Sequence, residues 1–327
     1  MSRVDAGSDG RVPTDYASAA SRCRAGADRT IERTMGTDPN AVGAPRLPDT
    51  LRLGRVHLTV STLDGSVAFY ERALGLQLHD RDGAVATLGA GGEDLLVLVE
   101  EAGAAPGGRH AGLFHYALLF ETRRELARAV KRLASTQTRI EGASDHGVSE
   151  SIYLRDPDDN GIELYADRPR EQWPPSRIPG ERVEIFTLAL DMEDLMREVD
   201  GEQPRARAGA GIVVGHLHLH VGDVEQGLAF YRDVLGFEVM VNLGTAALVS
   251  AGGYHHHLGF NVWLGSDVKP RPPQTAGLRE WTVLLASREE LAVVRARIAA
   301  TGLYVRADHG GFVVRDPWET AVAFRVG

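Results

Sequence analysis

The feature of this sequence that most restricts its fold is an internal repeat. The segment GRVHLTVSTLDGSVAFYERALGLQL spans residues 54–78, and the similar segment GHLHLHVGDVEQGLAFYRDVLGFEV spans residues 215–239, a constant offset of 161 positions. Both begin with apolar residues at alternate positions, which predicts a strand with one buried face, and then change to helical spacing through Ala-Phe-Tyr. Such self-similarity indicates a core assembled from repeated supersecondary units.

Each half of the chain contains two such units. Further strand patterns follow the repeat, AVATLG and DLLVLVE in the first half and AALVSAG and HHLGFNVW in the second. A second unit begins at residues 112–120 or 277–286, continues with helical patterns at 123–135 or 288–300, and ends with strands that flank an Asp-Pro turn. The pattern predicts an α+β protein of four βαβββ units, numbered here one to four in chain order.

Composition divides the chain into segments. Residues 1–48 contain few large apolar side chains and many Gly, Ala, Asp, Arg and Ser residues, which predicts a disordered N-terminal extension. Units one and two are expected to form a first domain at 51–166, and units three and four a second domain at 212–327. Between them lies a Pro- and Arg-rich linker, 167–211, with a short acidic helix around DMEDLMREV.

Charge and cysteine content restrict the function classes. A formal net charge of −9 with interspersed signs indicates neither a nucleic-acid partner nor a membrane partner. The one cysteine, Cys23, cannot form an intramolecular disulfide, which suits a reducing compartment. No signal peptide and no apolar stretch of about 18 residues is evident, so we expect a cytoplasmic protein, with self-association into a homo-oligomer left open.

Four βαβββ units with Phe-Tyr…Leu-Gly helices and Asp-Pro turns resemble the vicinal oxygen chelate superfamily, which includes glyoxalases, bleomycin-resistance proteins and extradiol dioxygenases. The resemblance covers residues 51–327 and is greatest to catechol 2,3-dioxygenase-type proteins. It implies two cup-shaped mixed β-sheets flanked by helices. In such proteins two units form a cup, with metal ligands on the first strand of each unit and on a last strand.

The segment HGVSESIYLRDPDDNGIE, residues 146–163, is similar to the extradiol dioxygenase signature. The resemblance implies that Glu163 is a carboxylate ligand and that His146 and Tyr153 line the substrate pocket. It also implies a first-strand ligand at His115. Ser144 and Asp159 depart from the residue types of the signature.

The resemblance leaves two sources for the third ligand. Unit three has His216 at the expected position, whereas unit one has Arg55 there and offers His57 nearby. Unit four carries Glu280 and Ala323 at its two ligand positions, so its set is incomplete. A triad of His216, His115 and Glu163 requires units two and three to pair across the linker. Pairing of units one and two would instead bring in His57.

Three consecutive histidines, His255 to His257, occupy the pattern predicted to be the last strand of unit three. The resemblance assigns an acid–base histidine to that strand, at His256. Alternation along a strand would direct His255 and His257 to the opposite face. On the first strand of the unit, His218 shares the expected face of His216 and is a candidate to hydrogen-bond a ligand or the substrate.

The function implied by the resemblance is that of an extradiol ring-cleaving dioxygenase. Such an enzyme uses Fe(II), with Mn(II) as an alternative, and its substrates are a small aromatic diol and O₂. Two histidines and one carboxylate suit this chemistry because they leave open coordination positions. The sequence leaves two alternatives: a redox-neutral, glyoxalase-like isomerase or hydrolase, and a metal-free protein that binds an aromatic ligand.

Overall fold

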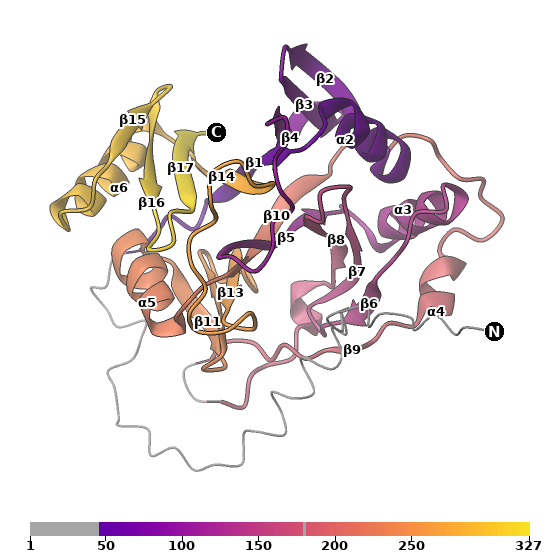
Figure 1. Ribbon diagram of the computed structural model, residues 1–327. Coiled ribbons are helices and arrows are strands. Elements are labelled where there is room, and N and C mark those ends of the chain that lie inside the picture. The colour runs from indigo at the N-terminus through magenta and orange to yellow at the C-terminus, as the bar shows by residue number, and fades with distance from the viewer. Residues whose placement is uncertain (1–45, 179–180) are drawn as a thin grey trace, which may run out of the picture.

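The computed structural model describes residues 46–178 and 181–327, in which two mixed sheets form the centre (Figure 1). The predicted α+β class is confirmed, whereas residues 1–45 of the predicted N-terminal extension lie outside the described part of the chain. Within the described residues, no helix is long and apolar enough to cross a membrane.

The first sheet has eight strands in the order β15-β16-β17-β14-β1-β4-β3-β2 and contains units one and four. Its strands are β1 (Arg52–Val60), β2 (Gln77–Asp82), β3 (Val85–Ala90), β4 (Glu93–Glu100), β14 (Gly277–Leu285), β15 (Arg306–Asp308), β16 (Gly311–Arg315) and β17 (Ala321–Val326). The first strands of the two units, β1 and β14, pair antiparallel at its centre.

The second sheet has nine strands in the order β11-β12-β13-β10-β5-β8-β7-β6-β9 and contains units two and three. Its strands are β5 (Gly112–Leu119), β6 (Gly142–Asp145), β7 (Ser149–Arg155), β8 (Gly161–Asp167), β9 (Leu188–Ala189), β10 (Val213–His220), β11 (Glu238–Asn242), β12 (Ala246–Ser250) and β13 (Leu258–Asn261). Antiparallel pairing of β5 with β10 joins the two units. Each sheet therefore combines one unit from each half of the chain.

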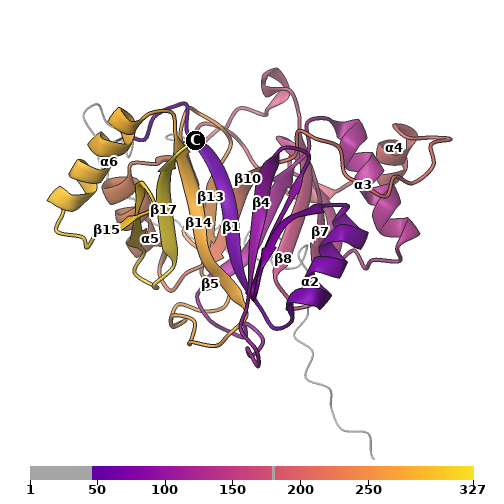
Figure 2. The same cartoon turned by 90° about the horizontal axis from the view of Figure 1, so that it is seen from above.

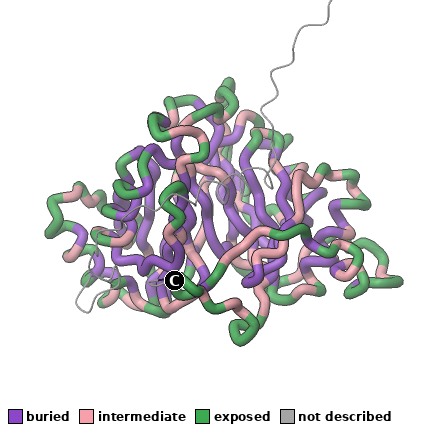
Figure 3. Tube along the Cα trace, turned by 90° about the horizontal axis from the view of Figure 1, so that it is seen from below, coloured by how far each residue is buried: buried purple, intermediate pink, exposed green. Residues whose placement is uncertain are grey.

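Helices pack at the two ends of this pair of sheets, with α5 and α6 at one end and α2, α3 and α4 at the other (Figure 2). Their bounds are α2 (Leu63–Phe69) with its π-helical continuation η1 (Tyr70–Leu74), α3 (Arg123–Ser135), η2 (Arg170–Gln172, one 3₁₀ turn), α4 (Met192–Arg197), α5 (Val224–Leu228) with its π-helical continuation η3 (Ala229–Leu235), and α6 (Arg288–Ala300). Strands and inward helix faces supply most buried residues (Figure 3).

The helices α3 and α6 have the bounds predicted from their apolar spacing because local chemistry defines their starts. Thr122 accepts a hydrogen bond from the backbone N–H of Glu125, and Ser287 accepts one from Glu290. Such caps satisfy N–H groups that a helix start would otherwise leave unpaired. The short helix predicted in the linker is also present, as α4. The linker also contributes β9, which pairs with β6 and forms one edge of the nine-stranded sheet.

The predicted strand that starts at His256 begins later, at Leu258. Gly252 and Gly253 both have positive φ angles, +62° and +66°, and form the turn that ends β12. His255, His256 and His257 therefore lie in the irregular segment before β13, so the predicted alternation of their side chains across a strand is wrong. After the turn at Gly252 and Gly253, the backbone regains strand geometry only at Leu258, two residues later than the apolar pattern predicted.

The tyrosines of the two Ala-Phe-Tyr motifs tie each repeat to the following unit. Tyr70 donates a hydrogen bond of 2.7 Å to Asp156, and Tyr231 donates one of 2.8 Å to Asp316. Both tyrosines are fully buried. Each aspartate also accepts backbone N–H groups of its own Asp-Pro turn. The motif tyrosines are thus structural, and each joins the two consecutive units of its half of the chain, which lie in different sheets, through a buried polar contact.

Replacing Tyr70 by phenylalanine is expected to lower the free energy of unfolding by about 1–3 kcal/mol, because it leaves a buried carboxylate oxygen with one donor fewer. Urea denaturation followed by circular dichroism measures this change. Tyr304, which is 80% exposed, provides the matched control, and Tyr304→Phe is expected to leave stability unchanged. Equal stabilities of all three proteins would contradict the structural role of Tyr70.

Candidate metal centre

Three adjacent strands of the nine-stranded sheet carry the residues predicted as metal ligands. His216 lies on β10, His115 on β5 and Glu163 on β8. Ala117 of β5 is the register partner of both His216 and Glu163, so these side chains emerge on one face of the sheet. His115 lies two residues before Ala117 and shares that face. Because Ala117 is small, the three longer side chains can meet above it.

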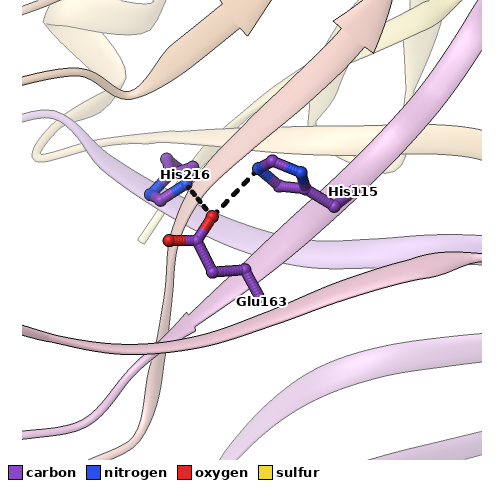
Figure 4. Close-up of side chains that lie close together, drawn as sticks. All are labelled: His115, Glu163 and His216. Carbon is purple, nitrogen blue, oxygen red and sulfur yellow. Dashed lines mark hydrogen bonds and ion pairs between the residues drawn. The ribbon is translucent and has the colours of Figure 1, made fainter. Parts of the chain in front are cut away.

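The three side chains point toward one another (Figure 4). Glu163 Oε2 lies 3.0 Å from His115 Nε2 and 3.0 Å from His216 Nε2. All three residues are buried, and one ligand atom from each lies within 4.8 Å of the others. Elsewhere in residues 46–178 and 181–327, no group of three His, Cys, Asp or Glu side chains has this property.

Burial and charge act in opposite directions at this cluster. Burial alone would raise the pKa of Glu163, but the charges and hydrogen bonds of His216 and His115 outweigh it and hold this pKa well below its usual range. Burial lowers the pKa of His115, although its contact with Glu163 partly opposes the effect. An ionised carboxylate and a neutral imidazole are the forms that bind a metal ion.

The donor set fits a divalent transition metal. Two imidazole nitrogens and one carboxylate oxygen on one face are the ligand types of non-heme iron oxygenases, and they leave coordination positions free for other ligands. Glu163 is also a buried carboxylate between two imidazoles, and removing such a charge from water is costly. A bound cation would offset that cost. His115, Glu163 and His216 are therefore the residues of this chain that could hold a metal.

The rival ligand His57 lies in the other sheet. It is on β1, where Glu280 is its register partner, because unit one pairs with unit four. The pKa of His57 is lowered to about 4, mainly by burial and then by the nearby charge of Arg325. Arg325 pairs with Glu280 and Asp308. The alternative in which His57 completes the metal site is therefore wrong, since its strand belongs to a different sheet.

His146 and Tyr153 lie beside the cluster and contact each other. His146 Nε2 is 2.7 Å from the Tyr153 hydroxyl, and its Nδ1 is 2.8 Å from the carbonyl oxygen of Phe186 in the linker. The Tyr153 and His115 ring centroids are 5.7 Å apart. Burial lowers the pKa of His146. Both residues thus lie close enough to the ligand cluster to contact a substrate bound beside it. The linker orients His146 through the carbonyl oxygen of Phe186.

His256 lies on the other flank of the cluster, with its ring centroid 4.1 Å from that of His216. Burial, and then the charges of His216 and His255, hold the pKa of His256 well below its usual range. His257 points elsewhere, with Nδ1 2.9 Å from the Ser250 hydroxyl. His255 is completely buried and contacts both His256 and Asp167. The three histidines therefore have three different environments.

A second group of polar and aromatic residues surrounds His218, the register partner of His115. The Asn261 side chain joins two histidines, with Nδ2 2.9 Å from His218 Nε2 and Oδ1 3.0 Å from His220 Nδ1. Trp263 lies 5.5 Å from the His218 ring and is 37% exposed. The sequence alone indicated no role for Asn261, although the repeat predicts the strand that carries it. That strand, β13, pairs with β10.

Sequence reasoning also missed Asp167 and Tyr254. Strand alternation from Glu163 directs Tyr165 and Asp167 to the same face of β8, and that pattern was the available signal. Tyr254 donates a hydrogen bond of 3.0 Å to Asp167, and its hydroxyl lies 2.8 Å from that of Tyr165. The position of Tyr254 depends on the turn at Gly252 and Gly253, so the spacing of apolar residues could not predict it.

The close approach of β5 and β8 requires a glycine at position 161. A Cβ atom at Gly161 would lie 2.0 Å from the carbonyl oxygen of Phe114. Gly161→Ala is therefore expected to part the two strands that carry His115 and Glu163, at a cost of about 1–3 kcal/mol. Thermal unfolding and an iron(II) titration measure the losses of stability and metal affinity.

Gly92 provides the control, because an added Cβ there has no neighbour within 4 Å. Gly92→Ala is expected to match the unsubstituted protein in both measurements. A Gly161→Ala variant with unchanged stability and unchanged iron affinity would contradict the strand geometry described here.

Comparison with known proteins identifies the superfamily of this chain. Residues 52–164 and 213–323 match the family described as "Glyoxalase/Bleomycin resistance protein/Dioxygenase superfamily". The chain is 40% identical over 270 residues to catechol-2,3-dioxygenase of Bacillus subtilis (strain 168), covering 81% of this chain and 93% of that protein.

Solved structures share the fold. A protein of Bacillus subtilis subsp. subtilis str. 168, provisionally assigned as a dioxygenase, has a TM-score of 0.56 at 13% identity, with 85% of each chain covered. Glyoxalase I from Zea mays has a TM-score of 0.51 at 16% identity, with 84% of this chain and 92% of that chain covered. At these identities the structural likeness concerns the fold alone.

Proposed function

Because the chain belongs to the glyoxalase/bleomycin resistance protein/dioxygenase superfamily, we propose that it is an iron(II)-dependent extradiol dioxygenase that opens a catechol-type ring with O₂. The observation that carries this proposal is the convergence of His115, Glu163 and His216 on one face of the nine-stranded sheet. The similarity to a catechol-2,3-dioxygenase over most of both chains supports it. Mn(II) is the alternative metal that the same donor set accepts.

Iron(II), when bound by these three residues, supplies the electron-transfer chemistry that links an aromatic diol to O₂. The protein supplies position and proton transfer. Imidazole nitrogens of His115 and His216 with the carboxylate of Glu163 would give the ligand set one negative charge, which would partly neutralise a divalent ion. The remaining charge favours a diol that has lost a proton.

His256 is the residue that we assign to proton transfer. It lies against His216 without hydrogen-bonding to the carboxylate of Glu163, so it can act on a substrate beside the ligands. An uncharged imidazole can accept a proton from a diol hydroxyl, and it can return that proton later in the reaction. Burial lowers the pKa of His256, so its ring is uncharged and has a nitrogen lone pair in the absence of substrate.

His146 and Tyr153 are assigned to the opposite flank. Their mutual hydrogen bond leaves His146 oriented by the Phe186 carbonyl and Tyr153 directed toward the His115 ring. The Phe186 carbonyl only accepts, so it requires a proton on His146 Nδ1, and the Tyr153 hydroxyl then donates to His146 Nε2. Redirected to a diol oxygen, the same hydroxyl would stabilise negative charge that develops there.

The test is oxygen consumption by protein reconstituted anaerobically with iron(II) and then given catechol and substituted catechols. We expect O₂ uptake matched one-to-one by a yellow ring-fission product. Firm iron binding without uptake from any catechol or hydroquinone would overturn the proposal in favour of redox-neutral, glyoxalase-like chemistry. Absence of iron binding would favour a metal-free protein that binds an aromatic ligand.

A further inference from the structure

A chain of hydrogen bonds runs from the end of β8 to the flank of the candidate metal centre. Asp167 Oδ1 lies 2.8 Å from His255 Nε2, and His255 Nδ1 lies 2.8 Å from His256 Nδ1. The His256 ring then packs against His216, 4.1 Å away between centroids. A carboxylate is therefore connected through two imidazoles to a residue beside the metal ligands.

Surrounding residues hold the chain in place. His255 has no exposed surface, and Trp173 packs edge-on against its ring at 5.2 Å. The Tyr254 hydroxyl donates to the second carboxylate oxygen of Asp167. Asp167 thus uses one oxygen for Tyr254 and the other for His255, which leaves His255 little freedom to rotate. A buried and doubly anchored imidazole is suited to orient a neighbour.

The donors and acceptors of the chain determine where the protons lie. A carboxylate oxygen only accepts, so Asp167 requires a proton on His255 Nε2. If that is the only proton on the His255 ring, its Nδ1 holds a lone pair, and His256 must supply the proton between the two Nδ1 atoms. This leaves the lone pair of His256 on Nε2. Within the described residues, Nε2 of His256 makes no hydrogen bond, so it is free for a substrate.

We propose that Asp167, acting through His255, is a positioning residue that holds His256 in the tautomer whose Nε2 is unprotonated. The role deepens the proposed function, on which it rests, since His256 is the residue assigned there to proton transfer. It also accounts for two of the three consecutive histidines. His256 acts on the substrate, His255 connects it to Asp167, and His257, which bonds to Ser250, is outside the chain.

The test uses Asp167→Asn. Tyr254 keeps the carbonyl oxygen of the new side chain as its acceptor, so the amide N–H₂ faces His255 Nε2 and donates to it. His255 must then carry its proton on Nδ1, and His256 must carry its own on Nε2. The substitution is expected to invert both tautomers while leaving size and packing nearly unchanged.

Ring ¹⁵N and ¹H NMR of the metal-free protein, labelled at histidine, reports the tautomers without any need for activity. We expect Nδ1-protonated His256 in the unsubstituted protein and Nε2-protonated His256 in Asp167→Asn. With the iron-loaded proteins, we expect Asp167→Asn to lower kcat by about 10²-fold or more, as loss of a carboxylate that orients a histidine does elsewhere. KM for catechol and the iron content are expected to change less than twofold.

Asp94→Asn is the matched control. Asp94 forms a similar pair with a histidine, 2.9 Å from His79 Nδ1, but in the eight-stranded sheet. It is expected to alter neither the His256 signals nor kcat. If Asp167→Asn does not fold, the unsubstituted protein still provides a test through the tautomer of His256.

The outcomes separate this inference from the proposed function. An Nε2-protonated His256 in the unsubstituted protein would overturn the inference, whatever the enzyme does. Inverted tautomers with unchanged kcat would also overturn it, because positioning would then have no consequence for turnover. Absence of oxygen uptake by the unsubstituted protein would overturn the proposed function, while the NMR result would still establish whether Asp167 determines the tautomer.

Discussion

Replacement of His216 by alanine is expected to abolish stable binding of iron(II). The substitution removes one of three ligand atoms that lie within 4.8 Å of one another and leaves Glu163 with one histidine partner. Loss of an outer hydrogen bond to a ligand already costs about 10–100-fold in metal affinity, and loss of the ligand itself should exceed that. Anaerobic titration with iron(II), with protein-bound iron measured after gel filtration, determines the affinity.

His57→Ala is the matched control, since His57 lies on the first strand of unit one and was the alternative candidate for the third metal ligand. It lies in the eight-stranded sheet, with Glu280 as its register partner, and is expected to leave iron affinity within about twofold of the original. The comparison tests the pairing of units as well as the ligand set. If His57→Ala lost iron and His216→Ala retained it, the assignment of the metal centre to units two and three would be wrong.

The second large effect is expected at His256. His256→Ala should retain iron and bind catechol, because none of the three ligand side chains is changed, yet lose turnover by about 10²–10⁴-fold. The physical reason is that His255, the neighbouring imidazole on the same flank of His216, uses both of its ring nitrogens, with Asp167 and with His256, and so cannot replace it. Bound iron, anaerobic catechol binding and oxygen uptake separate these effects.

His257→Ala is the control for this prediction, because its ring bonds to Ser250 instead of joining the chain toward the metal centre. It is expected to retain most of the turnover. Loss of iron from His256→Ala would identify His256 as a fourth ligand and would favour the redox-neutral chemistry. Full turnover by His256→Ala would remove it from the mechanism.

The sequence by itself determined the units, and its resemblance to the extradiol dioxygenases named the ligand candidates. Alternating and helical apolar spacing defined the four βαβββ units, and caps at Thr122 and Ser287 defined the starts of α3 and α6. These features depend on residues within a few positions of one another, so a single sequence contains them. The motif around Glu163 likewise named His146 and Tyr153, which the structure brings next to the cluster.

Only the tertiary structure decided which units share a sheet. β1 and β10 have similar sequences, and either could have paired with β5, since the linker between the halves is long enough for both arrangements. Backbone hydrogen bonds between strands carry little sequence information, and the choice depends on the packing of all four units together. That choice placed His216 beside Glu163 and His57 beside Arg325.

The tertiary structure also decided what the three histidines do. Apolar spacing predicted a strand through His256, but the Gly252–Gly253 turn bends the backbone there, and contacts from distant residues set each ring. Asp167 and Trp173, both far away in the sequence, hold His255. Local pattern identifies which residues have useful chemistry. Their orientation comes from partners that only the folded chain brings within hydrogen-bonding distance, because such contacts depend on long-range packing.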